Sequence, residues 1–270
     1  MTASVRQIFP AAGPELPVSP VTAEVPGPPA VAALASLYAY PDSGGQPGPP
    51  WVRANMISSA DGAATLDGRS GGLSGPADRM VFAVLRSLAD VILVGAGTAR
   101  AERYRPVQPG AVWAGLRAGR GPAPRIAVVT SRLGPDLDDL LLAPAAGGPS
   151  IVLTTEAVPE DRRAAVARRA DVIVAGSTTV DPAAAIGALA RLGLTRILVE
   201  GGPQLLGQLF TAGLVDDLCL TVSPVVAAGH AIRITNSAAE TGGTALDLAH
   251  VLADDGQLIC RYLRQPAVTG

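Results

Sequence analysis

The chain of 270 residues contains no lysine, so arginine supplies all 21 of its basic side chains. A P-loop needs a lysine on the nucleotide phosphates, and pyridoxal-phosphate enzymes need one to form a Schiff base with the cofactor. The sequence therefore excludes both kinds of site.

Histidine and cysteine are scarce as well, with two of each. His230 and His250 do not stand at the spacing of zinc ligands. Cys219 and Cys260 lie far apart, each in an apolar stretch, which does not favour a disulfide or a CxxC metal site. We expect two buried thiols and no bound metal.

Long apolar runs and an excess of positive charge are missing too. The net charge of −2 provides no basic surface for nucleic acid. No uninterrupted run of about 18 or more apolar residues is present, so we expect no membrane span. The N-terminus lacks the pattern of a secretion signal. The expectation is a cytoplasmic enzyme with a small-molecule substrate, and neither nucleic acid nor a membrane as a partner.

Proline divides the chain into two parts. Eleven of its 24 prolines lie in residues 1–50, which predicts a partly ordered N-terminal extension with one short helix over Ala30–Tyr40. The domain proper is expected over residues 51–265. With 48% hydrophobic residues, the chain is long enough to bury one large core.

Beyond residue 50, short apolar runs alternate with amphipathic stretches. The runs predict strands over 51–57, 91–94, 125–130, 151–154, 172–174 and 197–199. The stretches predict helices over 75–88, 160–170, 182–192 and 203–212, the first with Ser74 as its N-cap. This alternation is typical of an α/β fold in three layers, with a mostly parallel sheet between helices. Strands predicted over 218–222, 246–252 and 258–263 lack intervening helices, which favours an antiparallel C-terminal edge.

Two glycine turns follow predicted strands. Gly95-Ala96-Gly97-Thr98 comes directly after Val94, and Glu200-Gly201-Gly202-Pro203 comes directly after Val199. Such junctions bind phosphate in parallel sheets, because free N–H groups and the positive end of the next helix meet there. The first turn is equally compatible with a purely structural role. The second turn carries a carboxylate at the strand end, which favours a ligand site over a helix cap.

Two Asp-Gly pairs are open to two interpretations. The stretch Ser58-Ser59-Ala60-Asp61-Gly62 fits an Asx turn as well as a ligand-binding loop. The stretch from Asp67 to Gly72 fits the tip of a hairpin as well as a ligand-binding loop.

Taken in order, these segments resemble the reductase domain of bacterial riboflavin biosynthesis, from about Trp51 to Leu263. The resemblance rests on Ser59-Ala60-Asp61-Gly62, Ser74-Gly75-Pro76 with Arg86, Gly95-Ala96-Gly97-Thr98, Glu200-Gly201-Gly202-Pro203-Gln204-Leu205-Leu206-Gly207, and residues 212–218. It implies a dihydrofolate-reductase-like fold and a homodimer. It also implies NADPH-dependent reduction of a ribosylaminopyrimidine phosphate, of the 5-amino-6-(5-phosphoribosylamino)uracil type.

The resemblance further implies which residues bind. The cofactor positions of the family match Ser58, Gly72, Thr98, Ser131, Gly202, Pro203, Gln204, Leu205, Leu206, Gly207 and Gln208. Arg132 would suit the 2′-phosphate of NADPH, because a planar guanidinium binds phosphate with two hydrogen bonds. The substrate positions match Ser70, Arg86 and Glu200.

Arginine suits a ribose phosphate and a carboxylate suits a polar ring. Glu200 is therefore the candidate catalytic residue, which either holds the substrate or relays a proton. Arg86 is also compatible with a solvated charge on a helix face.

The sequence departs from the bifunctional members of the family in two respects. The deaminase half with its zinc ligands is missing. The family's Asp-Asp-Pro is replaced by Glu102-Arg103-Tyr104, so we expect Glu102 to take the place of the cofactor-contacting aspartate. The downstream substrate arginine has no clear counterpart. Two alternatives stay open, a reductase of dihydrofolate or another pteridine, and a non-catalytic NADP-binding protein.

Overall fold

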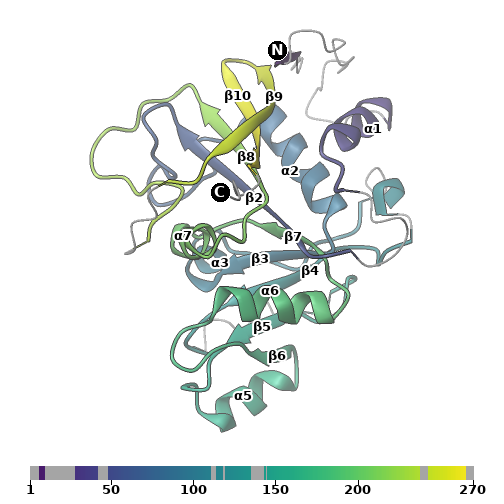
Figure 1. Cartoon of the computed structure of the whole chain (residues 1–270), viewed down its shortest axis with the longest axis vertical. Coiled ribbons are helices and arrows are strands. Elements are labelled where there is room, and N and C mark those ends of the chain that lie inside the picture. The colour runs from purple at the N-terminus through teal and green to yellow at the C-terminus, as the bar shows by residue number, and fades with distance from the viewer. Residues whose placement is uncertain are drawn as a thin grey trace, which may run out of the picture.

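The computed structural model describes residues 6–9, 28–41, 48–110, 114–117, 119–134, 143, 145–237 and 243–265. One sheet runs through these residues, with its strands in the order β1-β9-β10-β8-β2-β7-β3-β4-β5-β6. Figure 1 shows the hairpin of β9 and β10 at one end of the molecule, β5 and β6 toward the other, and α2 and α6 beside different parts of the sheet.

The strands and helices predicted over residues 51–263 are all present, with ends that shift by a few residues. The strands are β1 (Arg6–Phe9), β2 (Trp51–Ser59), β3 (Val91–Gly95), β4 (Arg125–Val129), β5 (Ile151–Thr154), β6 (Asp171–Val174), β7 (Arg196–Val199), β8 (Asp217–Ser223), β9 (Leu246–Asp254) and β10 (Gln257–Arg264). The helices are α1 (Pro28–Leu37), α2 (Pro76–Leu88), α3 (Ala96–Ala101), α5 (Glu160–Ala167), α6 (Pro182–Arg191) and α7 (Pro203–Thr211), with a 3-10 turn, η1, over Gly115–Arg117.

The sheet is parallel from β8 through β2, β7, β3, β4 and β5 to β6. At the other end, β8, β10, β9 and β1 pair antiparallel. The predicted mixed sheet with antiparallel C-terminal strands is confirmed. One detail was wrong, because β8 also pairs parallel with β2. The crossover through α7 carries the chain past β2, so that β8 starts at the same edge as β7.

Helices cover both faces of the sheet and make the predicted three layers. On one face, α6 and α7 bury Leu189 and Leu206 against Ile197 and Val199 of β7. On the other face, α1 and α2 pack against Leu198 of the same strand. Successive residues of β7 thus enter opposite core layers, which is why its sequence is continuously apolar.

The start of α2 differs from the prediction. Gly75, not Ser74, is the N-cap, and no side chain caps this helix. The Ser74 hydroxyl donates instead to a carboxylate oxygen of Asp78, at 2.5 Å. A hydrogen bond to a charged acceptor is strong, so it orients the Ser74 side chain toward Asp78.

Helix α1 belongs to the core although it precedes residue 50. Its Leu34 is fully buried, as is Tyr38 just after the helix, and both pack with residues of α2. The division of the chain at residue 50 stays a prediction. Cys219 and Cys260 are buried free thiols, as expected.

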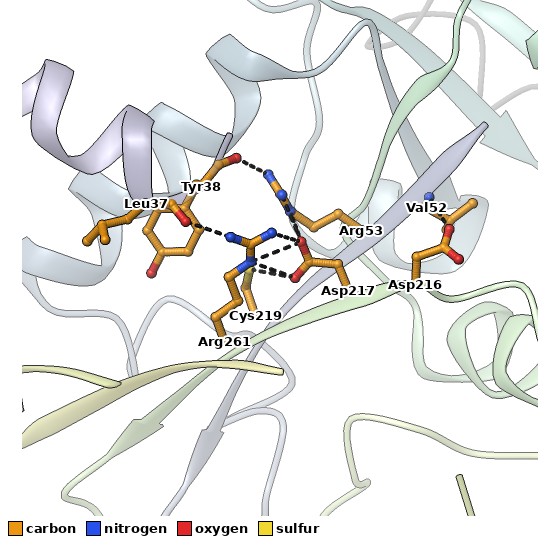
Figure 2. Close-up of polar contacts among 8 residues, drawn as sticks. All are labelled: Leu37, Tyr38, Val52, Arg53, Asp216, Asp217, Cys219 and Arg261. Carbon is orange, nitrogen blue, oxygen red and sulfur yellow. Dashed lines mark hydrogen bonds and ion pairs between the residues drawn. The ribbon is translucent and has the colours of Figure 1, made fainter. Parts of the chain in front are cut away.

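A buried ion network joins α1 to three strands (Figure 2). Arg53 of β2 and Arg261 of β10 each place a guanidinium nitrogen 2.7 Å from the same carboxylate oxygen of Asp217 on β8. Arg53 also donates to the Tyr38 carbonyl at 2.7 Å, and Arg261 donates to the Leu37 carbonyl at 2.6 Å. Burial alone would raise the pKa of Asp217, but the two guanidinium charges outweigh burial and lower it.

Replacing Asp217 by alanine is expected to lower the free energy of unfolding by about 3–5 kcal/mol, because two guanidinium groups lose the carboxylate that they share in the interior. Urea unfolding followed by circular dichroism measures this loss. Asp171 gives the control, since its side chain is 51% exposed in its pair with Arg125. Asp171→Ala should lose about 1 kcal/mol or less. Similar losses in the two variants would contradict the prediction.

Candidate active site

The carboxyl ends of β8, β2, β7, β3 and β4 meet at one edge of the sheet, because these strands are adjacent and parallel. The two predicted glycine turns lie next to each other there. The Gly95 N–H donates to the Gly201 carbonyl at 2.9 Å. Since β7 lies between β2 and β3, Glu200 stands between segments from the first half of the chain.

The contact between the two turns requires glycine. A Cβ atom on Gly202 would lie 2.5 Å from Thr98 Oγ1, which is closer than such atoms approach. Gly201 has a φ of +93°, where side chains other than glycine are strained. Helix α7 begins with Pro203, so its first N–H groups lie at this turn. The arrangement suits a phosphate-bearing ligand.

A cavity of about 480 Å³ lies at this edge. Its walls come from β2, the loop before α2, the first two turns of α2, the end of α3 and the turn after β7. Asn55, Asp78, Glu102 and Glu200 bring polar groups to it, and Met56 and Phe82 bring apolar ones. A cavity of this size with a few polar groups suits a small organic ligand.

The Glu200 carboxylate in this wall accepts three hydrogen bonds from other side chains, and only 2% of the Glu200 side chain is exposed. Arg86 donates through Nε to Oε1 at 2.7 Å and through its Nη2 atom to Oε2 at 2.6 Å. The Tyr104 hydroxyl donates to Oε2 at 2.6 Å. Burial and the Glu200 charge raise the pKa of the Tyr104 hydroxyl well above its usual value, so this hydroxyl keeps its proton.

Arg86 is an ion-pair partner of Glu200 and not a solvated charge. Its guanidinium carbon lies 4.2 Å from the centre of the Phe82 ring and 5.4 Å from that of Tyr104. Burial alone would lower the pKa of Arg86, but Glu200 and Tyr104 outweigh it and raise this pKa. Two of the three substrate residues that the resemblance implied, Arg86 and Glu200, are thus paired with each other.

Glu102 connects α3 to the loop before α2. Its Oε1 accepts the Ser70 N–H at 2.8 Å. The same loop contains the predicted hairpin tip, where Leu66 and Arg69 form an antiparallel bridge around Asp67 and Gly68. Asp67 and Gly68 have positive φ angles of 49° and 78°, as a two-residue hairpin turn requires. Glu102 therefore holds this hairpin over the cavity wall.

The structure brings many of the predicted site residues together. The cavity is lined by Ser70, Thr98, Glu102, Glu200, Gly202 and Pro203. Ser131 and Arg132 are exposed directly after β4, farther along the same sheet edge. Ser58 is buried near the end of β2, and Gly72 is exposed beside the hairpin.

The predicted residues of α7 divide into two groups. Gln204 and Gln208 are exposed. Leu205 and Leu206 are buried in the core, and Gly207 is buried so close to Asn236 that a Cβ atom would lie 2.9 Å from the Asn236 carbonyl oxygen. Any contact of Leu205 and Leu206 with a cofactor would therefore come from the backbone.

The first Asp-Gly pair has a structural role. The Asp61 carboxylate accepts the N–H groups of Ala227 and Ala228 at 3.0 and 2.7 Å, and the Ser59 hydroxyl at 2.5 Å. The Ser59 hydroxyl and the two N–H groups lower the pKa of Asp61 to about 2. Asp61 thus anchors the loop that follows β8, which Figure 1 shows extending away from the sheet.

Sequence reasoning missed Tyr104 and Asp78. In the sequence, Tyr104 stands out only as a departure from the family pattern. Asp78 lies three and seven residues before Val81 and Leu85, on the buried side of α2. An acidic residue in an apolar helix stripe seldom stands there without a partner or a function.

Within the described residues, no helix has the length and apolar character needed to cross a membrane. In the same part of the chain, histidine, cysteine, aspartate and glutamate side chains form no group of three or more that could hold a metal ion.

The site and fold agree with what comparison with known proteins finds. The chain is 31% identical over 183 residues to the 2,5-diamino-6-ribosylamino-4(3H)-pyrimidinone 5′-phosphate reductase of Archaeoglobus fulgidus, covering 67% of this chain and 83% of that protein. It is 29% identical over 184 residues to the protein of the same name from Methanothermobacter thermautotrophicus, covering 68% and 82%. A crystal structure of a pyrimidine reductase-like protein from Corynebacterium diphtheriae matches with a TM-score of 0.72 and 29% identity, over 80% of this chain and 92% of that one.

Both curated relatives are named as reductases, which confirms the predicted enzyme class, an oxidoreductase. The order of the sheet confirms the predicted fold class, a mostly parallel mixed sheet with antiparallel C-terminal strands, and the match in structure shows that the pyrimidine reductase-like protein shares this fold. Residues 50–260 match the family described as the RibD C-terminal domain. The chain therefore belongs to the RibD C-terminal domain family.

Proposed function

We propose that this protein is an NADPH-dependent reductase of a ribosylaminopyrimidine 5′-phosphate in riboflavin biosynthesis. The observation that carries the proposal is the position of Glu200, a buried and fully oriented carboxylate beside the glycine turn in the wall of a 480 Å³ cavity. The names of the two archaeal relatives support the substrate class.

The residues at the sheet edge fit a dinucleotide. Gly202 lies against the Thr98 hydroxyl with no room for a side chain, and α7 starts directly after it. Arg132 is exposed after β4, where its guanidinium is available for a phosphate. Thr98, Gly202 and Arg132 would hold the cofactor. When bound, NADPH supplies the hydride.

The chain's own residues orient the substrate. Arg86 and Tyr104 hold Glu200 in one orientation before any ligand arrives, which removes the cost of reorganisation during the reaction. Three donors already occupy the Glu200 carboxylate, and one acceptor position on Oε1 remains for an N–H or O–H group of the substrate. We therefore assign Glu200 to holding the substrate in preference to relaying a proton.

The segment from Glu102 to Tyr104 supports catalysis over a binding role alone. Its Glu102 and Tyr104 side chains both bind groups in the cavity wall, at Ser70 and at Glu200. The residues that replace the family motif thus form part of the site. The homodimer and the cytoplasmic location stay predictions.

The proposed reaction is tested by the oxidation of NADPH in parallel assays with a ribosylaminopyrimidine phosphate and with dihydrofolate. We expect oxidation with the first substrate, because the cavity offers polar groups for a small ring. Oxidation with dihydrofolate alone would favour the pteridine reductase instead. Tight binding of NADPH without oxidation of it in either assay would indicate a non-catalytic binding protein.

Replacing Glu200 by glutamine is expected to reduce turnover by at least about tenfold while the affinity for NADPH changes little, because the amide loses the ion pair with Arg86 and one acceptor oxygen. Steady-state kinetics and NADPH fluorescence measure the two effects separately. Glu160→Gln, at an exposed position at the start of α5, serves as the matched control. Unchanged turnover in Glu200→Gln would contradict a role for Glu200 in the reaction.

Replacing Tyr104 by phenylalanine removes one donor from Glu200 and leaves the aromatic ring beside Arg86. We expect the turnover number to fall about tenfold, the effect of one hydrogen bond to a charged group. The KM for NADPH should stay the same, since Tyr104 acts through Glu200. Tyr262→Phe is the control, because Tyr262 is partly buried on β10 and does not line the cavity. A loss confined to the NADPH KM would contradict a positioning role for Tyr104.

A further inference from the structure

The cavity contains a second buried carboxylate, Asp78, whose partners differ in kind from those of Glu200. Asp78 is 8% exposed and lines the cavity from the first turn of α2. Its Oδ1 accepts the Thr221 hydroxyl at 2.7 Å, and its Oδ2 accepts the Ser74 hydroxyl at 2.5 Å. Among the residues that the structure describes, no arginine forms an ion pair with it. Neutral hydroxyl groups thus hold Asp78, whereas a guanidinium cation holds Glu200.

The two kinds of partner respond differently when a carboxylate gains a proton. A hydroxyl group can both donate and accept, so Ser74 or Thr221 can turn to accept from a protonated Asp78 as well as donate to an ionised one. A guanidinium only donates, so protonation of Glu200 would break its ion pair with Arg86. Of the two carboxylates, Asp78 is therefore the one that can release and regain a proton without losing its partners.

The surroundings of Asp78 hold it firmly in place. Gln257 of β10 donates to the Leu73 carbonyl at 2.9 Å, in the loop before α2. A Cβ atom on Gly75 would lie 2.3 Å from Gln257 Oε1, so β10 packs directly against the start of α2. Thr221 reaches Asp78 from the neighbouring strand β8. A carboxyl group fixed from three elements needs little reorganisation during a reaction in the cavity.

The proposed reduction consumes a proton as well as a hydride. A ribosylamine is in equilibrium with an open form, an imine in which a double bond joins C1 of the ribose to the nitrogen. A hydride from NADPH makes a new C–H bond at C1, and the electron pair of the second C=N bond passes to the nitrogen. That nitrogen must then take up one proton. Glu200 is unsuited to supply it because it is paired with Arg86, and burial raises the pKa of Tyr104 so that its hydroxyl keeps its proton.

We propose that Asp78 is the general acid of the reaction and donates its proton to that nitrogen as the hydride reaches C1. Asp78 is left as a carboxylate, to which Ser74 and Thr221 both donate, as they do in the structure. The imine, one hydride and one proton together give a secondary amine. Water that enters the cavity after the product leaves returns a proton to Asp78. This inference rests on the proposed function and divides its chemistry, with Glu200 holding the substrate and Asp78 supplying the proton.

Asp78→Asn tests the inference, because asparagine can still bind both hydroxyl groups but has no acidic proton to give. We expect kcat to fall at least about 100-fold, the usual size of general acid catalysis. The affinity for NADPH, measured by fluorescence, and the midpoint of thermal unfolding should change little. Asp161→Asn, in the exposed first turn of α5, is the matched control and should keep the wild-type kcat.

Chemical rescue distinguishes proton donation from a merely structural role. Asp78→Ala leaves room in the cavity wall where formic acid can take the place of the missing carboxyl group. Added formate should raise kcat of this variant about tenfold, a part of what general acid catalysis contributes, and more so as the pH falls. Chloride at the same ionic strength should have no such effect.

The pH dependence gives a further test that keeps Asp78 in place. The cavity wall also contains the ionisable side chains of Arg79, Glu102, Tyr104 and Glu200. Thr221→Val leaves all of these unchanged and removes one donor from Asp78. The wild-type kcat should fall at high pH, where Asp78 has lost its proton, and in Thr221→Val this fall should move to higher pH because the charged form has lost a hydrogen bond. Thr178→Val, at an exposed position after β6, is the control and should keep the wild-type profile.

The outcomes separate the inference from the proposed function. A wild type that does not oxidise NADPH with a ribosylaminopyrimidine phosphate would overturn the proposed function. An active wild type whose folded Asp78→Asn variant keeps its kcat, or loses only affinity for the substrate, would overturn the inference and leave the proposed function standing. If Asp78→Asn does not fold, the Thr221→Val profile decides, and an unmoved fall at high pH would overturn the inference alone.

Discussion

The pairing of Arg53 with Asp217 in the interior determines the register on which the site depends. Both side chains are fully buried, so neither charge can be left without the other. Arg53 stands opposite Asp217 in the parallel pairing of β2 with β8, and the same register places Ile57 opposite Thr221 four residues farther along. A slip of one residue would turn Thr221 to the other face of the sheet and away from Asp78. The network in Figure 2 lies outside the cavity, but it fixes the strand register that positions the cavity wall at Asp78.

Arginine also fixes the ends of the helices that carry the site. Arg53 and Arg261 bind the last carbonyls of α1 and the residue after it. Arg117 and Arg120 bind carbonyls at the end of α2, including that of Ala89 at 2.7 and 3.3 Å. A guanidinium has five donors in a rigid plane and can reach several carbonyls at once, which an ammonium group does less well. A chain without lysine is suited to this role, and arginine side chains hold the C-terminal ends of both α1 and α2. Asp78 near its start and Arg86 near its end are therefore fixed relative to each other.

The sequence predicted the helices and strands well, but it did not show which strands lie next to each other in the sheet. The apolar runs of β3 and β7 identify them as buried strands, because each buries residues on both faces. Nothing in those runs shows that β7 inserts between β2 and β3, a pairing across more than a hundred residues that puts Glu200 at the centre of the site. Glu200 was found because it ends a strand before two glycines. The pairing of Glu200 with Arg86 and Tyr104 was missed because these residues come from separate segments that meet only in the folded sheet. The prediction of Ser74 as the N-cap of α2 was wrong for a similar reason, because its hydroxyl binds the Asp78 carboxylate and Gly75 takes the capping position.

The two carboxylates of the cavity explain how a changed family motif is compatible with a working site. Tyr104, at the position of a family proline, donates to Glu200 and completes a carboxylate that already binds Arg86 on both oxygens. These three donors fix the carboxylate in the wall and leave one acceptor position on Oε1 for the substrate. Asp78 has the opposite character, with two neutral donors and free acceptor positions on both oxygens. Glu200 is thus held by an ion pair with Arg86, whereas Asp78 is held by the hydroxyl groups of Ser74 and Thr221. The segment Glu102-Arg103-Tyr104, which replaces Asp-Asp-Pro, therefore supports the site through two contacts, from Glu102 to the Ser70 N–H and from Tyr104 to Glu200.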